Sequence, residues 1–144
     1  QATADADRLT TREQTLLDAA DKKVARQLEA AKNKSYDNRT RLQAALAVQA
    51  DIDETRSALY TSETENNQLL IGLKLELADR DISPEKETEI NKKIRQEEAV
   101  INIKVNKAMN DRGLLARETM ARQVTDSLLD LDSDLEITNT TITP

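Results

Sequence analysis

The chain has 144 residues, of which 21 are basic and 27 acidic, and it contains no Cys, His, Trp or Phe. Without His and Cys, the usual imidazole bases, thiolate nucleophiles and zinc or haem sites are excluded, so we expect no enzyme activity, no cofactor and no metal. With only two Gly and two Pro, the sequence also lacks the turn residues that a β-sandwich or barrel needs. An all-α fold is therefore predicted.

The large aliphatic side chains make up about a quarter of the chain, which is thin for a compact core but sufficient for long helices that share a narrow apolar seam. No apolar run approaches the ~20 residues of a membrane span, and no dense basic stripe with stacking aromatics is present. We therefore expect neither a transmembrane segment nor sequence-specific nucleic-acid binding. Because the first residue is Gln and not Met, we expect a processed chain or part of a longer one.

The first predicted element is a leading helix over residues 4–32. Its apolar side chains recur at intervals of three, four or seven residues and share one face: Leu9, Leu16, Ala20, Val24, Leu28 and Ala31. Asp5 and Asp7 place negative charge in its first turn, where the helix dipole favours it. In residues 33–38, several side chains compete with the helical backbone for hydrogen bonds, so we expect a kink or short connection there unless the helix runs straight through.

The second predicted helix covers residues 40–79, in a frame of alternating three- and four-residue spacing. Four of its inner positions are polar: Gln49, Arg56, Glu63 and Asn66. A continuous apolar seam would have to desolvate Arg56 and Glu63, which is costly unless they pair. The middle of this helix therefore either faces water or forms a polar layer that sets the register.

The clearest helix boundary lies between these residues and the next stretch. Ser83 is a good N-cap, Pro84 is favoured at the first helical position, and acidic residues follow in the first turns. A connection this short predicts that residues 40–79 and 84–131 form an antiparallel hairpin that turns at residues 80–84.

From Pro84 onward the chain begins as a long helical stretch whose apolar side chains repeat at nearly eleven residues, which favours nearly straight or slightly right-handed packing. Gly113 follows Asn110 and Asp111, and a glycine at such a place favours a helix end. Alternating acidic residues and then β-branched side chains predict an extended arm over residues 132–144, able to add a strand to a neighbour. We interpret residues 1–144 as one elongated helical unit, a coiled-coil-like bundle.

In two segments, residues 73–77 and 101–106, apolar and polar side chains alternate with period two, which gives a different assignment. Such alternation is typical of half-buried strands, and two strands around a helix would form a βαβ unit. Two lone strands make a weak sheet, however, and neither segment is bounded by turn residues on its outer side. Helices are therefore favoured over strands.

Several segments are apolar on more than one helix face, among them residues 69–77 and the adjacent pair Leu128 and Leu129. Helices of this kind need more than one neighbour, which predicts oligomerisation. The predicted oligomer interface comprises Leu70, Leu73, Leu77, Ile94, Ile101, Val105, Met109, Met120, Val124 and Leu128. We expect the chain to assemble with copies of itself and with other subunits of the same assembly.

The leading functional hypothesis is a non-enzymatic structural subunit of a homo-oligomeric tube, ring or filament. Few aromatics, no Cys and abundant Ala, Asn, Thr and Gln are compositional habits of virion-internal proteins and secreted appendage subunits. This composition favours a virion or an extracellular or periplasmic assembly over the cytoplasm. The alternatives are a helical-hairpin adaptor or chaperone-like module for a partner helix, and a helical protein that acts at a membrane surface or forms pores.

Overall fold

A computed structural model describes residues 8–131, and this part of the chain contains five helices and no strand. The helices are α2 (Thr11–Lys32), α3 (Asn38–Glu65), α4 (Gln68–Leu77), α5 (Pro84–Asp111) and α6 (Leu114–Leu131). The all-α prediction is confirmed. The alternating segments 73–77 and 101–106 lie in α4 and α5, so the strand assignment is wrong. The extended C-terminal segment predicted over residues 132–144 lies outside the described residues.

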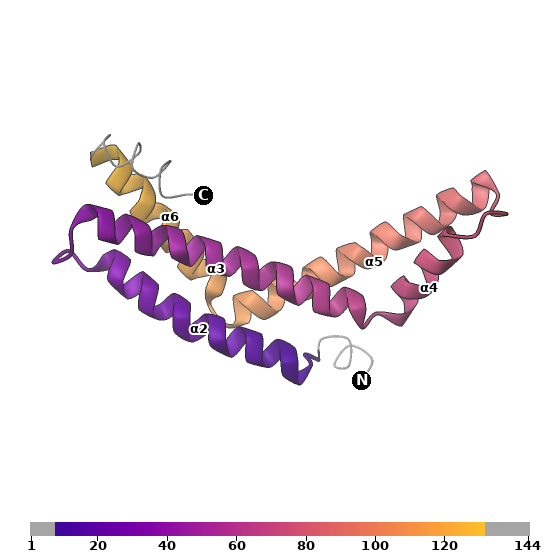
Figure 1. Ribbon diagram of the computed structural model, residues 1–144, viewed down its shortest axis with the longest axis horizontal. Coiled ribbons are helices and arrows are strands. Elements are labelled where there is room, and N and C mark those ends of the chain that lie inside the picture. The colour runs from indigo at the N-terminus through magenta and orange to yellow at the C-terminus, as the bar shows by residue number, and fades with distance from the viewer. Residues whose placement is uncertain (1–7, 132–144) are drawn as a thin grey trace.

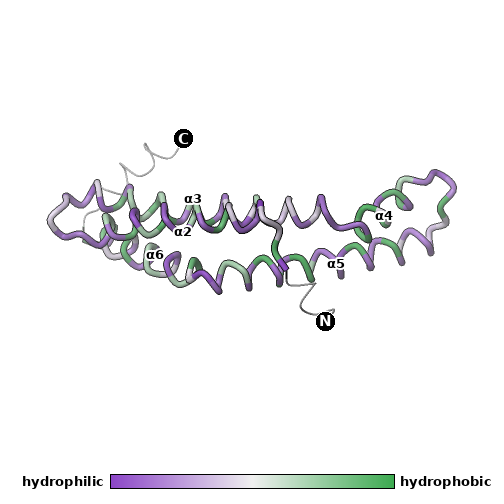
Figure 2. Tube along the Cα trace, turned by 90° about the horizontal axis from the view of Figure 1, so that it is seen from below, coloured by the Kyte–Doolittle hydropathy of each residue, from purple (hydrophilic) through white to green (hydrophobic). Residues whose placement is uncertain are grey.

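The molecule is elongated and has two parts (Figure 1). At one end α2, α3 and α6 pack side by side, and we call this part the bundle. At the other end α4 and the N-terminal half of α5 form a two-helix hairpin, which we call the arm because it projects from the bundle. The end of α3, the start of α2 and the middle of α5 meet where the two parts join, and Figure 2 shows the same extended outline from another side.

The leading helix begins later than predicted, at a capping box. The Thr10 hydroxyl accepts a hydrogen bond from the Glu13 backbone N–H at 3.1 Å, and the Glu13 carboxylate accepts one from the Thr10 N–H at 2.9 Å. These reciprocal bonds satisfy two donors at the helix start and fix it there. The predicted start at residue 4 is therefore wrong, because residues 8–10 precede the helix. Asp5 and Asp7 lie outside the described residues.

Residues 33–37 reverse the chain between α2 and α3, which confirms the expected connection. The Asp37 carboxylate caps α3 by accepting a hydrogen bond from the Thr40 N–H at 2.7 Å. The Arg41 guanidinium donates to the backbone carbonyl of Ala31 at 2.9 Å and ties the two helix ends together. The leading helix therefore folds back along α3 and becomes part of the bundle.

The predicted helix over residues 40–79 is interrupted after Glu65. Asn67 has an extended backbone, and its side-chain oxygen caps α4 by accepting a hydrogen bond from the Leu70 N–H at 2.9 Å. Its amide nitrogen donates to the Glu97 carboxylate of α5 at 2.8 Å. One continuous helix is wrong here because an asparagine side chain offers the backbone a competing hydrogen bond and also binds the facing helix.

The boundaries of α5 follow the sequence signals. The Ser83 hydroxyl accepts a hydrogen bond from the Lys86 N–H at 3.2 Å, and Pro84 is the first residue of α5. As predicted, α4 and α5 lie antiparallel (Figure 1). The stretch predicted over 84–131 is divided at Gly113, whose φ of +72° lies in the left-handed region that glycine adopts without a steric penalty.

Apolar side chains from all five helices form a core that runs from the bundle into the arm. Its members include Leu17, Val24, Val48, Ile52, Leu59, Leu70, Ile94, Ile101, Met109 and Leu114. A smaller cluster around Leu42 and Leu128 closes the far end of the bundle. The folded chain therefore buries an apolar core of its own.

Three of the four polar inner positions of α3 pair with side chains on the facing helices. The pairs are Gln49 with Thr125 at 3.1 Å, Arg56 with Glu118 at 3.4 Å, and Glu63 with Lys104 at 2.8 Å. The fourth, Asn66, ends α3. Of the two alternatives left open by the sequence, α3 thus forms a polar layer instead of facing water.

Candidate interaction surface

Most of the predicted interface residues lie inside the core of the chain itself. Seven are buried: Leu70, Leu73, Ile94, Ile101, Val105, Met109 and Leu128. Leu77 and Val124 are half-buried, and Met120 is exposed. Because the buried seven already pack within this chain, a contact made by the folded surface needs other side chains.

Exposed large apolar side chains are concentrated on the arm and at its joint with the bundle. Leu69, Ile71 and Leu75 are exposed on α4, and Val100 and Ile103 are exposed on α5. The bundle exposes Met120 and Leu131 along one cleft on α6, and its α2–α3 connection exposes Tyr36. The arm and the joint therefore carry the candidate contact surfaces.

The outer face of α4 carries the first of these surfaces. Ile71 and Leu75 are four residues apart and share a face, which we call the α4 stripe. Leu70 and Leu73 are buried on another face of the same helix, so α4 is apolar on two sides, and Figure 2 shows hydrophobic residues along it. A Cβ added at Gly72, beside the stripe, would meet no atom within 4 Å, so this face is open. The α4 stripe is an unpartnered apolar face in the folded chain.

The second surface lies on α5 at the joint. Val100 and Ile103 are three residues apart on one face, and we call them the α5 patch. They line a cleft of about 440 Å³, the elbow cleft, where the start of α2, the end of α3 and α5 meet. The other lining residues are Arg8, Thr10, Glu63, Asn66, Asn67, Glu97, Ile101, Lys104 and Lys107. The cleft thus combines an exposed apolar patch with polar and charged walls.

The exposed side chains also explain why two helical segments alternate with period two. On α5, Ile101 and Val105 are buried in the core, whereas Ile103 is exposed. On α4, Leu73 is buried and Leu75 is exposed. A helix that is apolar on two faces imitates the alternation of a strand. That second face was the signal in the sequence for a surface beyond the core.

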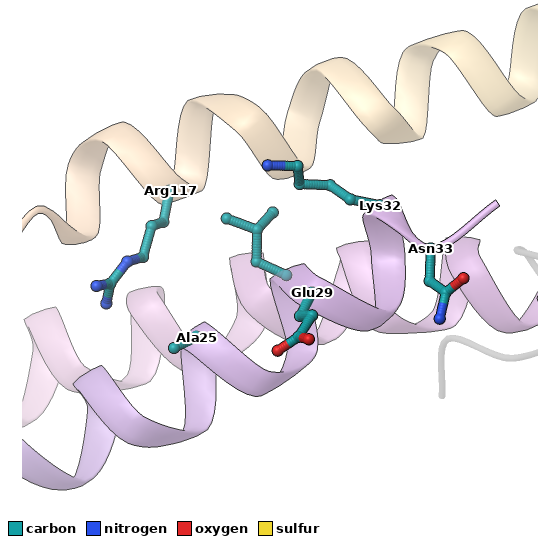
Figure 3. A pocket seen from close by; sticks show the side chains of 6 residues that line it. Ala25, Glu29, Lys32, Asn33 and Arg117 are labelled. Atoms are coloured by element: carbon teal, nitrogen blue, oxygen red, sulfur yellow. The ribbon is translucent and has the colours of Figure 1, made fainter.

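A further cleft, of about 470 Å³, lies between α2 and α6 (Figure 3). Arg117 reaches from α6 toward α2, Lys32 reaches from α2 toward α6, and Glu29 points away from α6. Arg117 also forms an ion pair with Asp21. This ion pair joins α6 to α2 beside the groove. Within residues 8–131, no group of three or more acidic side chains is placed to hold a metal ion.

Two findings concern the chain more broadly. None of the helices in the described range has both the length and the hydropathy to cross a membrane. No protein-family model, curated protein or solved structure matches this chain.

Proposed function

We propose that this chain is a non-enzymatic structural subunit that assembles with copies of itself through the α4 stripe and the α5 patch. The supporting observation is that two separate apolar surfaces stay exposed after the chain has buried its core. Clustered exposed apolar side chains are typical of protein contact surfaces, whereas scattered ones need no explanation.

Two unlike patches on one chain favour a head-to-tail contact, in which the α4 stripe of one copy packs on the α5 patch of the next. A contact of this kind repeats and generates a ring or a filament, whereas a contact between like patches closes at a dimer. Each patch is small compared with the ~800 Å² that each partner buries in a standard interface. We therefore expect an association that strengthens with concentration.

Sedimentation velocity and light scattering over a concentration series test the proposal. We expect species larger than a dimer whose mass grows with concentration. Leu75→Gln should disable the α4 stripe and Ile103→Gln the α5 patch, each abolishing the larger species without loss of helix content. Tyr36→Gln is the control, because Tyr36 is 47% exposed in the connection between α2 and α3 and lies outside both patches.

Mixing the two variants tests the head-to-tail arrangement itself. The Leu75→Gln chain keeps its α5 patch and the Ile103→Gln chain keeps its α4 stripe, so an equimolar mixture should form a heterodimer and nothing longer. A wild-type chain that stays monomeric at every concentration contradicts the proposal, as does association that survives both substitutions. A chain that stays monomeric by itself and forms a complex only with an added amphipathic helix would favour the adaptor hypothesis over the structural subunit.

A further inference from the structure

Two carboxyl groups lie buried together where α2, α3 and α5 meet. Glu13 of α2 is fully buried, and its Oε1 accepts the hydrogen bond from the Thr10 N–H at 2.9 Å. Its Oε2 is also buried and has no hydrogen-bond partner. Glu63 of α3 is mostly buried, and its Oε1 lies 2.8 Å from Nζ of Lys104 on α5. A buried carboxylate oxygen without a donor is costly, so Oε2 of Glu13 needs a proton donor from its neighbours.

We propose that Glu13 and Glu63 share one proton, and that this proton clamps the start of α2 to the joint between the bundle and the arm. In this arrangement the Glu63 carboxyl donates a hydrogen bond to Oε2 of Glu13, while Lys104 stays paired with the other oxygen of Glu63. The buried oxygen without a partner then has a donor. Two ionised carboxylates beside one ammonium would instead leave a net negative charge in a poorly solvated place, which favours binding of a proton.

The charged groups around Glu63 come from α5, from α2 and from the residues before α2. They are Glu13, Arg8, Glu97, Lys104 and Lys107. Glu97 accepts a hydrogen bond from Asn67, and Lys104 makes the direct ion pair with Glu63. Glu13 and Glu63 are the two acids in contact with each other, so the shared proton is assigned to them.

The pKa values support this assignment. Burial raises the pKa of Glu63, and hydrogen bonding to Glu13 raises it further, against the opposing effect of Lys104. Burial by itself also raises the pKa of Glu13, but the nearby Glu63 carboxyl, the Thr10 backbone N–H, the Ser62 side chain and the charge of Lys104 together hold it below the ordinary value. The two pKa values are thus pushed apart, as expected for two acids that share a proton.

The direction of the pH dependence follows from these shifts. Because folding raises the pKa of Glu63, its contribution to stability is complete below the ordinary Glu pKa and is lost as the pH rises through the raised value. Because folding lowers the pKa of Glu13, its contribution is present above the ordinary Glu pKa and is lost as the pH falls through the lowered value. The clamp is therefore strongest between the two pKa values and loosens on the alkaline side when the shared proton leaves.

Carboxyl-carbon and amide NMR titrations of the full chain test the clamp. We expect the Glu63 carboxyl to titrate above the ordinary Glu range, and the Thr10 amide, which donates to Glu13, to shift with the same midpoint. In Glu63→Gln the side-chain amide replaces the shared proton as a permanent donor, so the Thr10 shift and the alkaline fall in the urea unfolding midpoint should both disappear. Glu54→Gln makes the same chemical change at an exposed position of α3 and should keep both.

Two results would overturn the clamp. One is a Glu63 carboxyl in the wild-type chain that titrates within the ordinary range and leaves the Thr10 amide unmoved. The other is a Glu63→Gln chain that keeps the wild-type pH dependence. If Glu63→Gln fails to fold, Glu13→Gln serves instead, because removing the facing carboxylate should bring the Glu63 midpoint down. A Glu63 midpoint that does not move in Glu13→Gln also contradicts the shared proton.

Discussion

At the scale of residues, polar side chains between the helices select how the helices align. Gln49, Arg56 and Glu63 occupy inner positions of α3, and each meets its partner on α5 or α6. A slip of α3 by one turn would separate these pairs while still burying hydrocarbon. Because a buried polar group without its partner is costly, the alignment that forms these pairs is favoured over alignments shifted by one turn. The apolar side chains supply most of the burial, and the polar pairs supply the alignment.

The capping box at the start of α2 carries a prediction at this scale. Thr10→Ala removes the hydroxyl that accepts from the Glu13 N–H, so the free energy of unfolding should fall by about 1 kcal/mol. Thr11→Ala is the control, because Thr11 is exposed and follows the cap by one residue. Urea unfolding followed by circular dichroism at constant pH measures both variants. Equal losses in the two variants would contradict the capping role of Thr10.

At the scale of elements, the helix ends decide the shape of the molecule. Residues 33–37 fold α2 back onto α3, and Asn67 redirects the chain from α3 into the arm within two residues. Gly113 separates α5 from α6, so that α6 can pack on the bundle. Without the interruption at Asn67, the end of α3 would run on into α4 and the joint would have no elbow cleft.

The two glycines give opposite predictions for the same substitution. A Cβ at Gly72 or at Gly113 would meet no atom within 4 Å, so free space does not distinguish them. Gly72→Ala replaces a poor helix former inside α4 and should raise the free energy of unfolding by up to about 1 kcal/mol. Gly113→Ala forces a side chain into the left-handed region and should lower it by about 1 kcal/mol or more. Urea unfolding at a concentration where the chain is monomeric measures both changes, and a shared sign would contradict the backbone argument.

At the scale of the whole molecule, the bundle and the arm differ in how well they can shield apolar surface. Three helices can each turn one face toward a common interior, as α2, α3 and α6 do. Two helices can cover only their mutual faces. Because α4 is apolar on two sides, one side packs against α5 and the other stays exposed as the α4 stripe. The exposed surface that carries the proposed function is thus a consequence of a two-helix arm.

The same difference predicts unequal local stability. Backbone amides of α4 and the N-terminal half of α5 should exchange hydrogen faster than those of α2, α3 and α6, since the arm has fewer buried contacts to break in local opening. Hydrogen exchange with mass spectrometry on a dilute sample measures this. Repeating the measurement at high concentration should slow exchange in the arm if the α4 stripe is covered by another copy. Equal protection of arm and bundle in the dilute sample would contradict the prediction.

The sequence by itself determined the helical class, the antiparallel hairpin and the helix start at Pro84. These features depend on local chemistry: hydrophobic periodicity, an N-cap and the fixed φ of proline all act within a few residues. The helix end at Gly113 could be predicted for the same reason, because it depends on the residue type at that one position. The capping box formed by Thr10 and Glu13 was equally local, and the sequence interpretation missed it because Asp5 and Asp7 suggested an earlier start.

Only the tertiary structure decided that the leading helix folds back along α3, where α3 ends and which apolar side chains face the core. Periodicity shows that Ile94 and Ile101 lie on an apolar face, but the same contact stabilises a helix whether its neighbour belongs to this chain or to another copy. Seven predicted interface residues are for that reason internal core, while Ile71, Leu75 and Ile103 remain at the surface. The physical reason is that hydrophobic burial is non-directional. The local sequence pattern specifies which side chains must be buried, and the three-dimensional packing decides which neighbours bury them.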